Sequence, residues 1–242
     1  GVSITKVYKA DSPNYLFIDL TIDATAQPGR FAISFTNRGK AVYTYSYQLG
    51  GRQRQPVDYQ GFDASDVICL ITPDRFATGD PSNDNDPSLR EKTVDRSKDY
   101  TRHGGDITGI IKHLDYFEKT GYTAIWSSPL LENNMEKWSY HGYAITDLYK
   151  VDPRFGTLED YITLANESRS RGIKLIMDVV SNHCGSGHWW MEDLPFADWL
   201  NYQDRMQTTT HRRTVNQDPY ASKADQEKMN NGWFVPSMPD LN

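Results

Sequence analysis

Hydrophobic and polar positions alternate with a period of two in the first part of the chain. Short β-branched or aromatic runs, separated by turns rich in Gly and Pro, cover Tyr15 to Ile22, Phe31 to Phe35 and Ala41 to Leu49. The alternating residues that share a face are Phe31, Ile33 and Phe35 in one run and Tyr43, Tyr45 and Tyr47 in another. This pattern predicts antiparallel strands with one buried face. Three or four strands are too few for a complete two-sheet sandwich, so we predict part of a β-sandwich domain in residues 1–62.

The hydrophobic period changes near residue 62. Apolar runs of strand length cover Asp66 to Thr72, Tyr122 to Trp126 and Lys174 to Val180. Two helical segments lie between them, one carried by Ile107, Ile110, Ile111, Leu114 and Phe117 and closed by Gly121, the other from Thr157 to Arg171 and closed by Gly172. The second helix opens with a sequence that resembles a capping box, with Asp160 in place of the usual Glu. Alternating strands and helices predict a parallel α/β domain in residues 63–184, and residues 185–242 are expected to be a loop-rich, aromatic excursion.

Polar residues lie at the carboxyl end of the third of these strands. Asp178 lies within the apolar run, and Asn182 and His183 follow directly after it. A carboxylate buried without hydrogen bonds or a cationic partner is costly, so Asp178 either has partners or lies where the strand opens into a cleft. In α/β barrels that end of the strands is where ligands bind. A buried aspartate that only holds a loop is the alternative interpretation.

Composition excludes some classes of partner. The 26 Lys and Arg against 32 Asp and Glu give a net charge of −6, and no basic run tracks nucleic acid or an anionic membrane. No apolar run approaches the roughly 18 residues needed to span a bilayer, and the sequence from Gly1 lacks a basic and then apolar signal segment. We therefore expect no nucleic-acid partner and no membrane span. Cys69 and Cys184 form neither a disulfide framework nor a CxxC metal site.

Two stretches concentrate oxygen atoms that could bind a cation. The loop from Pro73 to Asp86 is rich in Asp and Asn, which supply the six to eight oxygen ligands that Ca²⁺ takes, although its spacing is not that of an EF-hand. Asp and Asn are also ordinary loop formers. In His103-Gly104-Gly105-Asp106, the Asp106 carboxylate either caps the following helix or faces an ion, and capping is the simpler interpretation.

The segment Tyr140-His141-Gly142-Tyr143 follows the second strand and brings aromatic rings to the same sheet edge as Asp178. Aromatic faces suit the C–H faces of a sugar, whose hydroxyls stay at the ring edge. A cluster of this kind also occurs in ordinary cores. His183 and His188 are five residues apart, a weak zinc signal that lacks a third ligand.

Together these blocks resemble the α-amylase family of glycoside hydrolases, and within it the neopullulanase and cyclomaltodextrinase group. The blocks are 73–84, 103–106, 121–129, 140–143, 178–183 and Met238-Pro239-Asp240-Leu241-Asn242. The resemblance covers residues 66–242, and residues 1–62 look like the latter part of the group's N-terminal β-sandwich. It implies an α/β fold with part of a (β/α)8 TIM barrel, namely its first three strands and the excursion after strand 3.

The resemblance also implies a function. Members of this family cleave α-1,4-glucosidic bonds in starch, maltooligosaccharides, pullulan or cyclodextrins by a retaining route that uses two carboxyl groups. By analogy, the nucleophile and the acid/base lie beyond this chain, so the chain alone is expected to be inactive. His183 matches the histidine that hydrogen-bonds the sugar beside the broken bond, Tyr143 matches the tyrosine stacked on that sugar, and His141 belongs to the same substrate-binding block. Asp178 matches a buried aspartate whose usual partner is an arginine on a later strand, so it is expected to lack that partner here.

Calcium and partners follow from the same resemblance. Asp80, Asn83, Asp84, Asp106 and the carbonyl of Gly104 match a structural calcium site, in which Thr78 stands where an Asn ligand is usual; Asn182 is a calcium ligand in other branches. The group often has Lys where Asp240 stands. Family members often dimerise through the N-terminal domain, and the resemblance favours a periplasmic or extracellular location. α-Glucan oligosaccharides are the expected ligands.

Two other hypotheses remain open at this stage. A non-catalytic glucan-binding protein would keep the β-module and the aromatic cleft, and the gene sequence after residue 242 would distinguish it from the enzyme. A metal-dependent phosphoesterase built around Asn182 and His183 would need several more His or Asp ligands, and only six histidines are present.

Overall fold

The computed structural model describes residues 1–51 and 61–242, which form two compact units, Gly1–Gly61 and Phe62–Asn242. The last part of the predicted N-terminal domain, residues 52–60, lies outside the described residues. No helix in the described ranges is long and apolar enough to cross a membrane.

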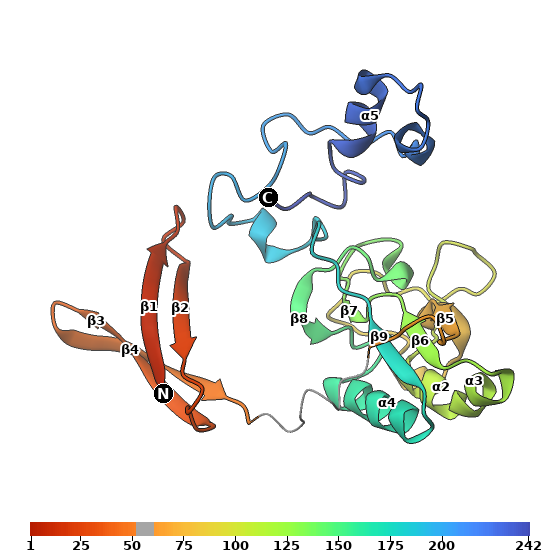
Figure 1. The fold of residues 1–242 in the computed structure, drawn as a ribbon, viewed down its shortest axis with the longest axis horizontal. Coiled ribbons are helices and arrows are strands. Elements are labelled where there is room, and N and C mark those ends of the chain that lie inside the picture. The colour runs from red at the N-terminus through yellow and green to blue at the C-terminus, as the bar shows by residue number, and fades with distance from the viewer. Residues whose placement is uncertain (52–60) are drawn as a thin grey trace. The chain divides into compact units, whose positions relative to one another are not determined.

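The first unit consists of two antiparallel hairpins (Figure 1). Strand β1 (Val2–Lys9) pairs with β2 (Leu16–Ile22), and β3 (Gly29–Asn37) pairs with β4 (Lys40–Leu49). The antiparallel pairing is confirmed, but β1 was not predicted. The β3–β4 turn places Arg38 and Gly39 at φ 49° and 78°, the left-handed values that tight hairpins favour. The predicted burial of this face is wrong for Tyr43 and Tyr45, which are 61% and 51% exposed, because no second layer of described residues covers the two-stranded ribbon.

The second unit is built on a parallel sheet with strand order β5-β6-β9. The strands are β5 (Ile68–Ile71), β6 (Ala124–Ser127) and β9 (Lys174–Met177). Both pairings are parallel, as the alternating strand and helix pattern predicted. The register places Leu70, Trp126 and Ile176 at one level of one sheet face. Asp178, two residues after Ile176, therefore belongs to that same face.

Helices cover the opposite face of this sheet. They are α2 (Ile107–Lys112), α3 (Leu114–Thr120) and α4 (Leu158–Ser170), and α4 packs against α2 and β9 (Figure 1). Apolar residues of these elements form the core, among them Ile71, Ile110, Phe117, Ile125 and Leu164. The capping box is confirmed: Asp160 Oδ2 accepts from Thr157 N–H at 2.8 Å, and Thr157 Oγ1 accepts from Asp160 N–H at 3.1 Å.

The first predicted helix is in fact two helices. His113 lies between α2 and α3 with φ −118° and ψ 18°, and its N–H caps α2 by donating to the carbonyls of Ile110 and Ile111. The ring of His113 bonds the carbonyl of Gly109 at 2.8 Å. The helical spacing of apolar residues survives this break, so the sequence pattern does not reveal it.

Longer connections follow each strand at its carboxyl end. They contain α1 (Pro73–Phe76) and the 3₁₀ turn η2 (Pro81–Asn83) after β5; β7 (Leu131–Glu132), η3 (Ser139–His141) and β8 (Asp147–Val151) after β6; and η4 (Trp189–Met191), η5 (Arg213–Asn216) and α5 (Lys223–Asn230) after β9. Helix α5 was not predicted within the loop-rich segment 185–242; it has no buried residue and so no apolar period to detect. The connection after β9 returns to its start through bridges from His183 to Asp240 and from Leu200 to Leu241.

Candidate substrate-binding site at the strand ends

The Asp178 carboxylate is partnered. Its Oδ2 accepts hydrogen bonds from Trp126 Nε1 and from Tyr143 Oη, each at 3.1 Å, and the side chain is half-buried. Both donors are neutral and come from other elements, Trp126 from β6 and Tyr143 from the connection after it. The sequence analysis missed Trp126 as a site residue, although its place on the same sheet face as Asp178 was a usable signal. Asp178 thus anchors β9 to β6 and to the loop that carries Tyr143.

Tyr143 and the two histidines predicted to bind substrate lie together. Tyr143 N–H donates to His141 Nδ1 at 2.9 Å, and the His141 and Tyr143 rings are 5.9 Å apart at 31°. His183 Nε2 donates to the Tyr143 carbonyl at 3.1 Å, which requires the proton to sit on that nitrogen. Gly142 permits this turn, because its φ of 83° places it in the left-handed region.

Both histidines are held in their neutral form near pH 7. Burial, followed by the nearby His183, lowers the pKa of His141 to about 4. Burial also lowers the pKa of His183, against the opposing effects of the Tyr143 carbonyl and the Asp240 carboxylate. Burial and the Asp178 carboxylate raise the pKa of Tyr143, so its hydroxyl remains a donor. The site therefore presents neutral imidazole and phenol rings beside the Asp178 carboxylate, which is a composition suited to holding an uncharged polyol.

Asp240 completes the rim next to His183. Its Oδ1 accepts from Asn182 Nδ2 and its Oδ2 from Asn201 Nδ2, both at 2.9 Å. Asn182, which matches a calcium ligand of other branches of the family, therefore turns its amide NH₂ toward this carboxylate. His188 is buried between Trp189 and Trp190, with ring centroids at 4.0 and 4.1 Å, and its Nδ1 accepts from Trp190 N–H. The histidine thus packs in an aromatic cluster.

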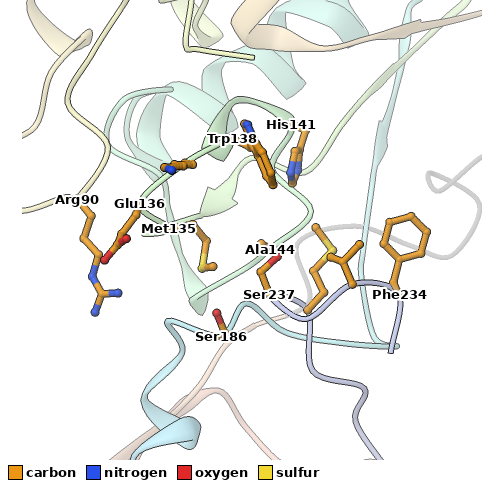
Figure 2. A pocket seen from close by; sticks show the side chains of 12 residues that line it. Arg90, Met135, Glu136, Trp138, His141, Ala144, Ser186, Phe234 and Ser237 are labelled. Atoms are coloured by element: carbon orange, nitrogen blue, oxygen red, sulfur yellow. The ribbon is translucent and has the colours of Figure 1, made fainter. Parts of the chain in front are cut away.

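A hollow of about 540 Å³ opens beside His141 (Figure 2). Residues from the connections after all three strands line it; they include Arg90 after β5, Met135 and Trp138 after β6, and Ser186, Phe234 and Met238 after β9. The Phe234 ring lies 6.4 Å from the His183 ring at an interplanar angle of 12°. The hollow is therefore adjacent to both histidines of the site. Of its lining, sequence reasoning singled out only His141 and the final block containing Met238.

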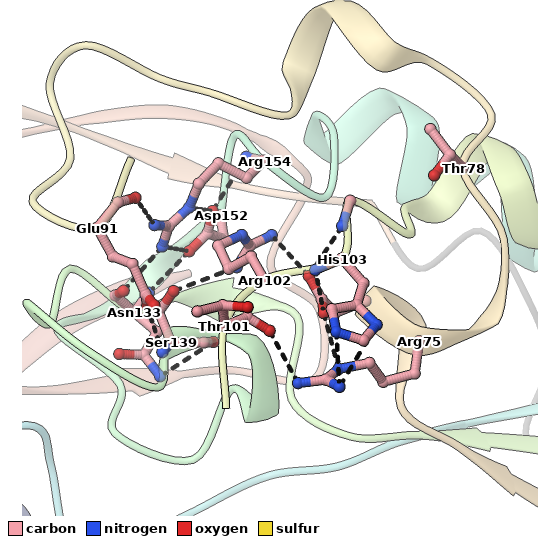
Figure 3. A network of polar contacts seen from close by, with 12 residues as sticks. Arg75, Thr78, Glu91, Thr101, Arg102, His103, Asn133, Ser139, Asp152 and Arg154 are labelled. Carbon is pink, nitrogen blue, oxygen red and sulfur yellow. Dashed lines mark hydrogen bonds and ion pairs between the residues drawn. The ribbon is translucent and has the colours of Figure 1, made fainter. Parts of the chain in front are cut away.

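A buried ionic network supports the turn that precedes Tyr143 (Figure 3). Asp152 and Arg154 form a fully buried ion pair, with Arg154 Nη2 2.7 Å from Asp152 Oδ2. Glu91 Oε2 accepts from Ser139 N–H at 2.7 Å, and Arg102 Nη1 donates to Ser139 Oγ at 3.3 Å. These contacts fix η3, the turn that leads to His141 and Tyr143. In the sequence these charges resemble solvated loop residues, so the network was missed.

Some of the residues predicted to bind calcium are in contact in pairs. Gly104 abuts Asp84, since a Cβ at Gly104 would collide with the Asp84 carboxylate. Asn83 Oδ1 and Asp84 Oδ1 are buried with no hydrogen-bond partner among the described residues. Burial raises the pKa of Asp84; Arg96 opposes this effect, and Asp106 adds to it.

Other members of this group already have partners. Asp106 Oδ1 caps α2 by accepting from Gly109 N–H at 2.6 Å, and its Oδ2 accepts from Asp80 N–H at 2.8 Å. Asp80 Oδ1 accepts from Ser82 N–H at 3.0 Å. Thr78 Oγ1 accepts from Arg96 Nη2 at 2.6 Å. Among the residues that the structure describes, no three His, Cys, Asp or Glu side chains are grouped closely enough to hold a metal ion.

Comparison with known proteins places the chain in a family. Residues 70–241 match the family model for the catalytic domain of α-amylase, and residues 1–53 match that for the N-terminal domain of cyclomaltodextrinase. The chain is 37% identical over 180 residues to the β/α-amylase of Paenibacillus polymyxa, covering 72% of this chain and 14% of that protein. It is 34% identical over 183 residues to neopullulanase 2 of Thermoactinomyces vulgaris, covering 72% of this chain and 28% of that protein.

Comparison with solved structures identifies similar enzymes. An Anoxybacillus α-amylase matches with a TM-score of 0.58 at 38% identity, over 73% of this chain and 34% of that one. The cyclic α-maltosyl-(1→6)-maltose hydrolase of Arthrobacter globiformis, in complex with cyclic α-maltosyl-(1→6)-maltose, matches with a TM-score of 0.52 at 30% identity, over 74% of this chain and 38% of that one. The chain thus spans about a third or less of the length of the curated relatives. With its parallel sheet and its match to the catalytic domain over residues 70–241, the chain belongs to the α-amylase family of glycoside hydrolases.

Proposed function

We propose that the whole protein is a retaining glycoside hydrolase that cleaves α-1,4-glucosidic bonds in starch, maltooligosaccharides, pullulan or cyclodextrins. One observation carries the proposal: Tyr143, from the connection after β6, meets Asp178 and His183, which follow β9, at the carboxyl edge of the parallel sheet in a chain of this family. Relatives of this chain include α-amylases and a neopullulanase. An uncharged sugar would stack on Tyr143 and receive hydrogen bonds from neutral donors nearby.

In this proposal the chain supplies the substrate-holding wall and other residues of the protein supply bond cleavage. A retaining enzyme needs two carboxyl groups about 5–5.5 Å apart, one to attack the anomeric carbon and one to protonate the leaving oxygen. Asp178 Oδ2 is occupied by two donors and positions Tyr143 and Trp126. We assign the nucleophile and the acid/base to residues outside this chain.

The same proposal extends to the fold and the domains. β5, β6 and β9 are taken as the first three strands of an eight-stranded barrel, 63–184 as its first three βα units and 185–242 as the excursion after strand 3. In support, Leu70 and Trp126, on the sheet face away from the helices, are 60% and 38% exposed. In a closed barrel this face would point inward, and barrel interiors are filled by layers of such apolar side chains. Residues 1–62 are taken as part of an N-terminal β-sandwich. Dimerisation through that domain remains a proposal that sedimentation would test.

We also propose a structural calcium site at Asp80, Asn83, Asp84, the Gly104 carbonyl and Asp106. The two buried oxygens without hydrogen-bond partners, on Asn83 and Asp84, favour it, because Ca²⁺ takes oxygen ligands of this kind. A bound ion would neutralise these carboxylates and join the loop after β5 to the start of α2. It has no part in bond cleavage.

The test is hydrolysis of maltoheptaose by the whole protein, with the anomer of the first product read by NMR. Release of the α-anomer supports the proposal, whereas release of the β-anomer contradicts the retaining route. The purified 242-residue chain serves as the second arm and is expected to show no turnover. Turnover by that chain alone would overturn the placing of the nucleophile outside it.

A further inference from the structure

The guanidinium of Arg75 is held in one orientation by contacts on several of its nitrogens (Figure 3). Arg75 lies in α1, directly after β5. Its Nη2 donates to the carbonyls of Asp99 and Thr101 at 2.6 and 2.8 Å, and its Nε lies 3.0 Å from the Asp74 carboxylate. Because the donors of a guanidinium form a rigid planar fork, these contacts fix the direction of its flat face.

This flat face lies against the ring of Tyr140. The guanidinium carbon of Arg75 is 4.1 Å from the centre of that ring, which is a cation–π contact. Tyr140 is half-buried and belongs to η3, in the connection after β6. The contact therefore joins the connections after β5 and β6 at the residue that precedes His141.

Tyr140 in turn supports the ring of His141. The two rings meet edge to face, with their centroids 5.5 Å apart at an interplanar angle of 74°. His141 Nδ1 accepts from Tyr143 N–H at 2.9 Å, so the proton of the neutral ring sits on Nε2. That N–H is the donor that His141 can offer to a ligand, and its direction depends on how Tyr140 and Tyr143 hold the ring.

The main chain of η3 has a separate anchor at Ser139. The Ser139 N–H donates to Glu91 Oε2 at 2.7 Å, and its hydroxyl accepts from Arg102 Nη1 at 3.3 Å. These two contacts hold the backbone of the turn, whereas Arg75 contacts the side chain of Tyr140. Loss of Arg75 would therefore leave the turn in place and free the ring.

We propose that Arg75 is a positioning residue for the candidate site: it holds the Tyr140 ring, against which His141 is set to donate to the sugar. The inference rests on the proposed function, in which His141 is one of the neutral donors to the substrate. Arg75 acts through Tyr140 and does not contact the sugar itself. Hydrogen bonds weaken steeply as their geometry worsens, so a freed ring would lower the efficiency of the site.

The experiment is a double-variant cycle in the whole protein, with kcat/KM for maltoheptaose as the measured quantity. We expect Arg75→Met and Tyr140→Leu each to lower kcat/KM about fivefold to tenfold, because each removes one half of the same contact. The double variant should lose no more than the more affected single variant, since the effect of Arg75 passes through the ring. Arg75→Lys should recover part of the loss, because an ammonium is also attracted to an aromatic face.

A matched control is Lys6→Met, which removes a cation 4.2 Å from the centre of the Tyr8 ring in the first unit and should leave kcat/KM unchanged. If Arg75→Met does not fold, Arg75→Lys with and without Tyr140→Leu gives the same comparison.

An unchanged kcat/KM in the Arg75 variants would overturn the proposal. So would losses that multiply in the double variant, because Arg75 would then act independently of Tyr140, as a purely structural residue does. Failure of the unmodified protein to cleave maltoheptaose would instead contradict the proposed function.

Discussion

Removing the negative charge of the buried Asp152–Arg154 pair should destabilise the second unit strongly. Asp152 Oδ1 accepts from Arg154 Nε at 2.9 Å and Oδ2 from Arg154 Nη2 at 2.7 Å, a two-pronged contact with both side chains fully buried. Burial opposes ionisation of Asp152, but the hydrogen bonds and charge of Arg154 prevail and hold the pKa of Asp152 below its usual value. In Asp152→Asn the Arg154 guanidinium keeps its charge and loses its counter-ion.

The expected size follows from this burial. Removing one partner of a buried ion pair costs about 3–5 kcal/mol, because the other charge remains uncompensated. For a unit of this length each kcal/mol lowers Tm by about 2–4 °C, so the variant should melt roughly 6–20 °C lower. Urea denaturation followed by circular dichroism measures the free energy of unfolding, and scanning calorimetry measures the Tm.

Two further variants make this prediction refutable. Asp115→Asn breaks the exposed pair with Lys119, whose side chains are 51% and 76% exposed, and should cost at most about 0.5 kcal/mol. The double variant Asp152→Asn, Arg154→Met removes both charges and should recover part of the loss. The prediction is contradicted if Asp152→Asn lowers the free energy of unfolding no more than Asp115→Asn does. It is also contradicted if adding Arg154→Met to Asp152→Asn lowers the free energy of unfolding further instead of restoring part of it.

Three other predictions concern the site and its surroundings. Burial lowers the pKa of His188 to about 4 from 6.5, so the unfolded chain takes up a proton first as the pH falls, and up to about 3 kcal/mol of the stability present above pH 6.5 should be lost on the way to pH 4. The variant His188→Asn keeps an acceptor for Trp190 N–H and should flatten this dependence, as measured by melting curves at a series of pH values. Calcium should raise the Tm and a chelator should lower it. The response should be larger in Thr78→Asn, because this variant offers an amide oxygen where Thr78 now accepts a hydrogen bond from Arg96. Equal Tm values with and without calcium in both proteins would contradict the proposed calcium site. Tyr143→Phe removes the hydroxyl that donates to Asp178 and should lower kcat/KM about tenfold in the whole protein, whereas an unchanged value would show that this hydrogen bond does not position the ring.

Local chemistry made some parts of the fold predictable. The capping pair Thr157 and Asp160, and the left-handed glycines Gly121 and Gly172 at helix ends, act within a few residues, so the sequence displays them directly. The order of apolar strands and helices likewise predicted the parallel sheet. Helix α5 could not be found in this way, because it buries no residue and its sequence has no apolar stripe.

The candidate site was predictable as a set of residues, not as a geometry. The residue pattern singled out Asp178, His183 and the segment that carries Tyr143, the resemblance supplied their roles, and the three residues do lie together. Their hydrogen-bond partners depend on which strands are neighbours and on how the loops return, neither of which a local pattern specifies. Trp126 reaches Asp178 because β6 pairs with β9, and Asp240 reaches His183 because the excursion folds back over a long stretch of chain.

The buried network explains why such distant segments produce one site. Burying Arg102 and Arg154 is tolerable only if opposite charges and acceptors converge on them. Arg154 donates to Asp152 and to the carbonyls of Glu91 and Asn133, whereas Arg102 donates to Ser139 and lies 3.7 Å from the Asp74 carboxylate. Satisfying these charges fixes the connections after β5 and β6 relative to one another, including Ser139. Because Ser139 lies four residues before Tyr143, the same requirement sets the turn that presents the site. The buried ion pairs and hydrogen bonds thus fix the positions of these loops, as apolar packing fixes the positions of the helices. Breaking the network should therefore change the geometry of the site as well as lower the stability of the fold.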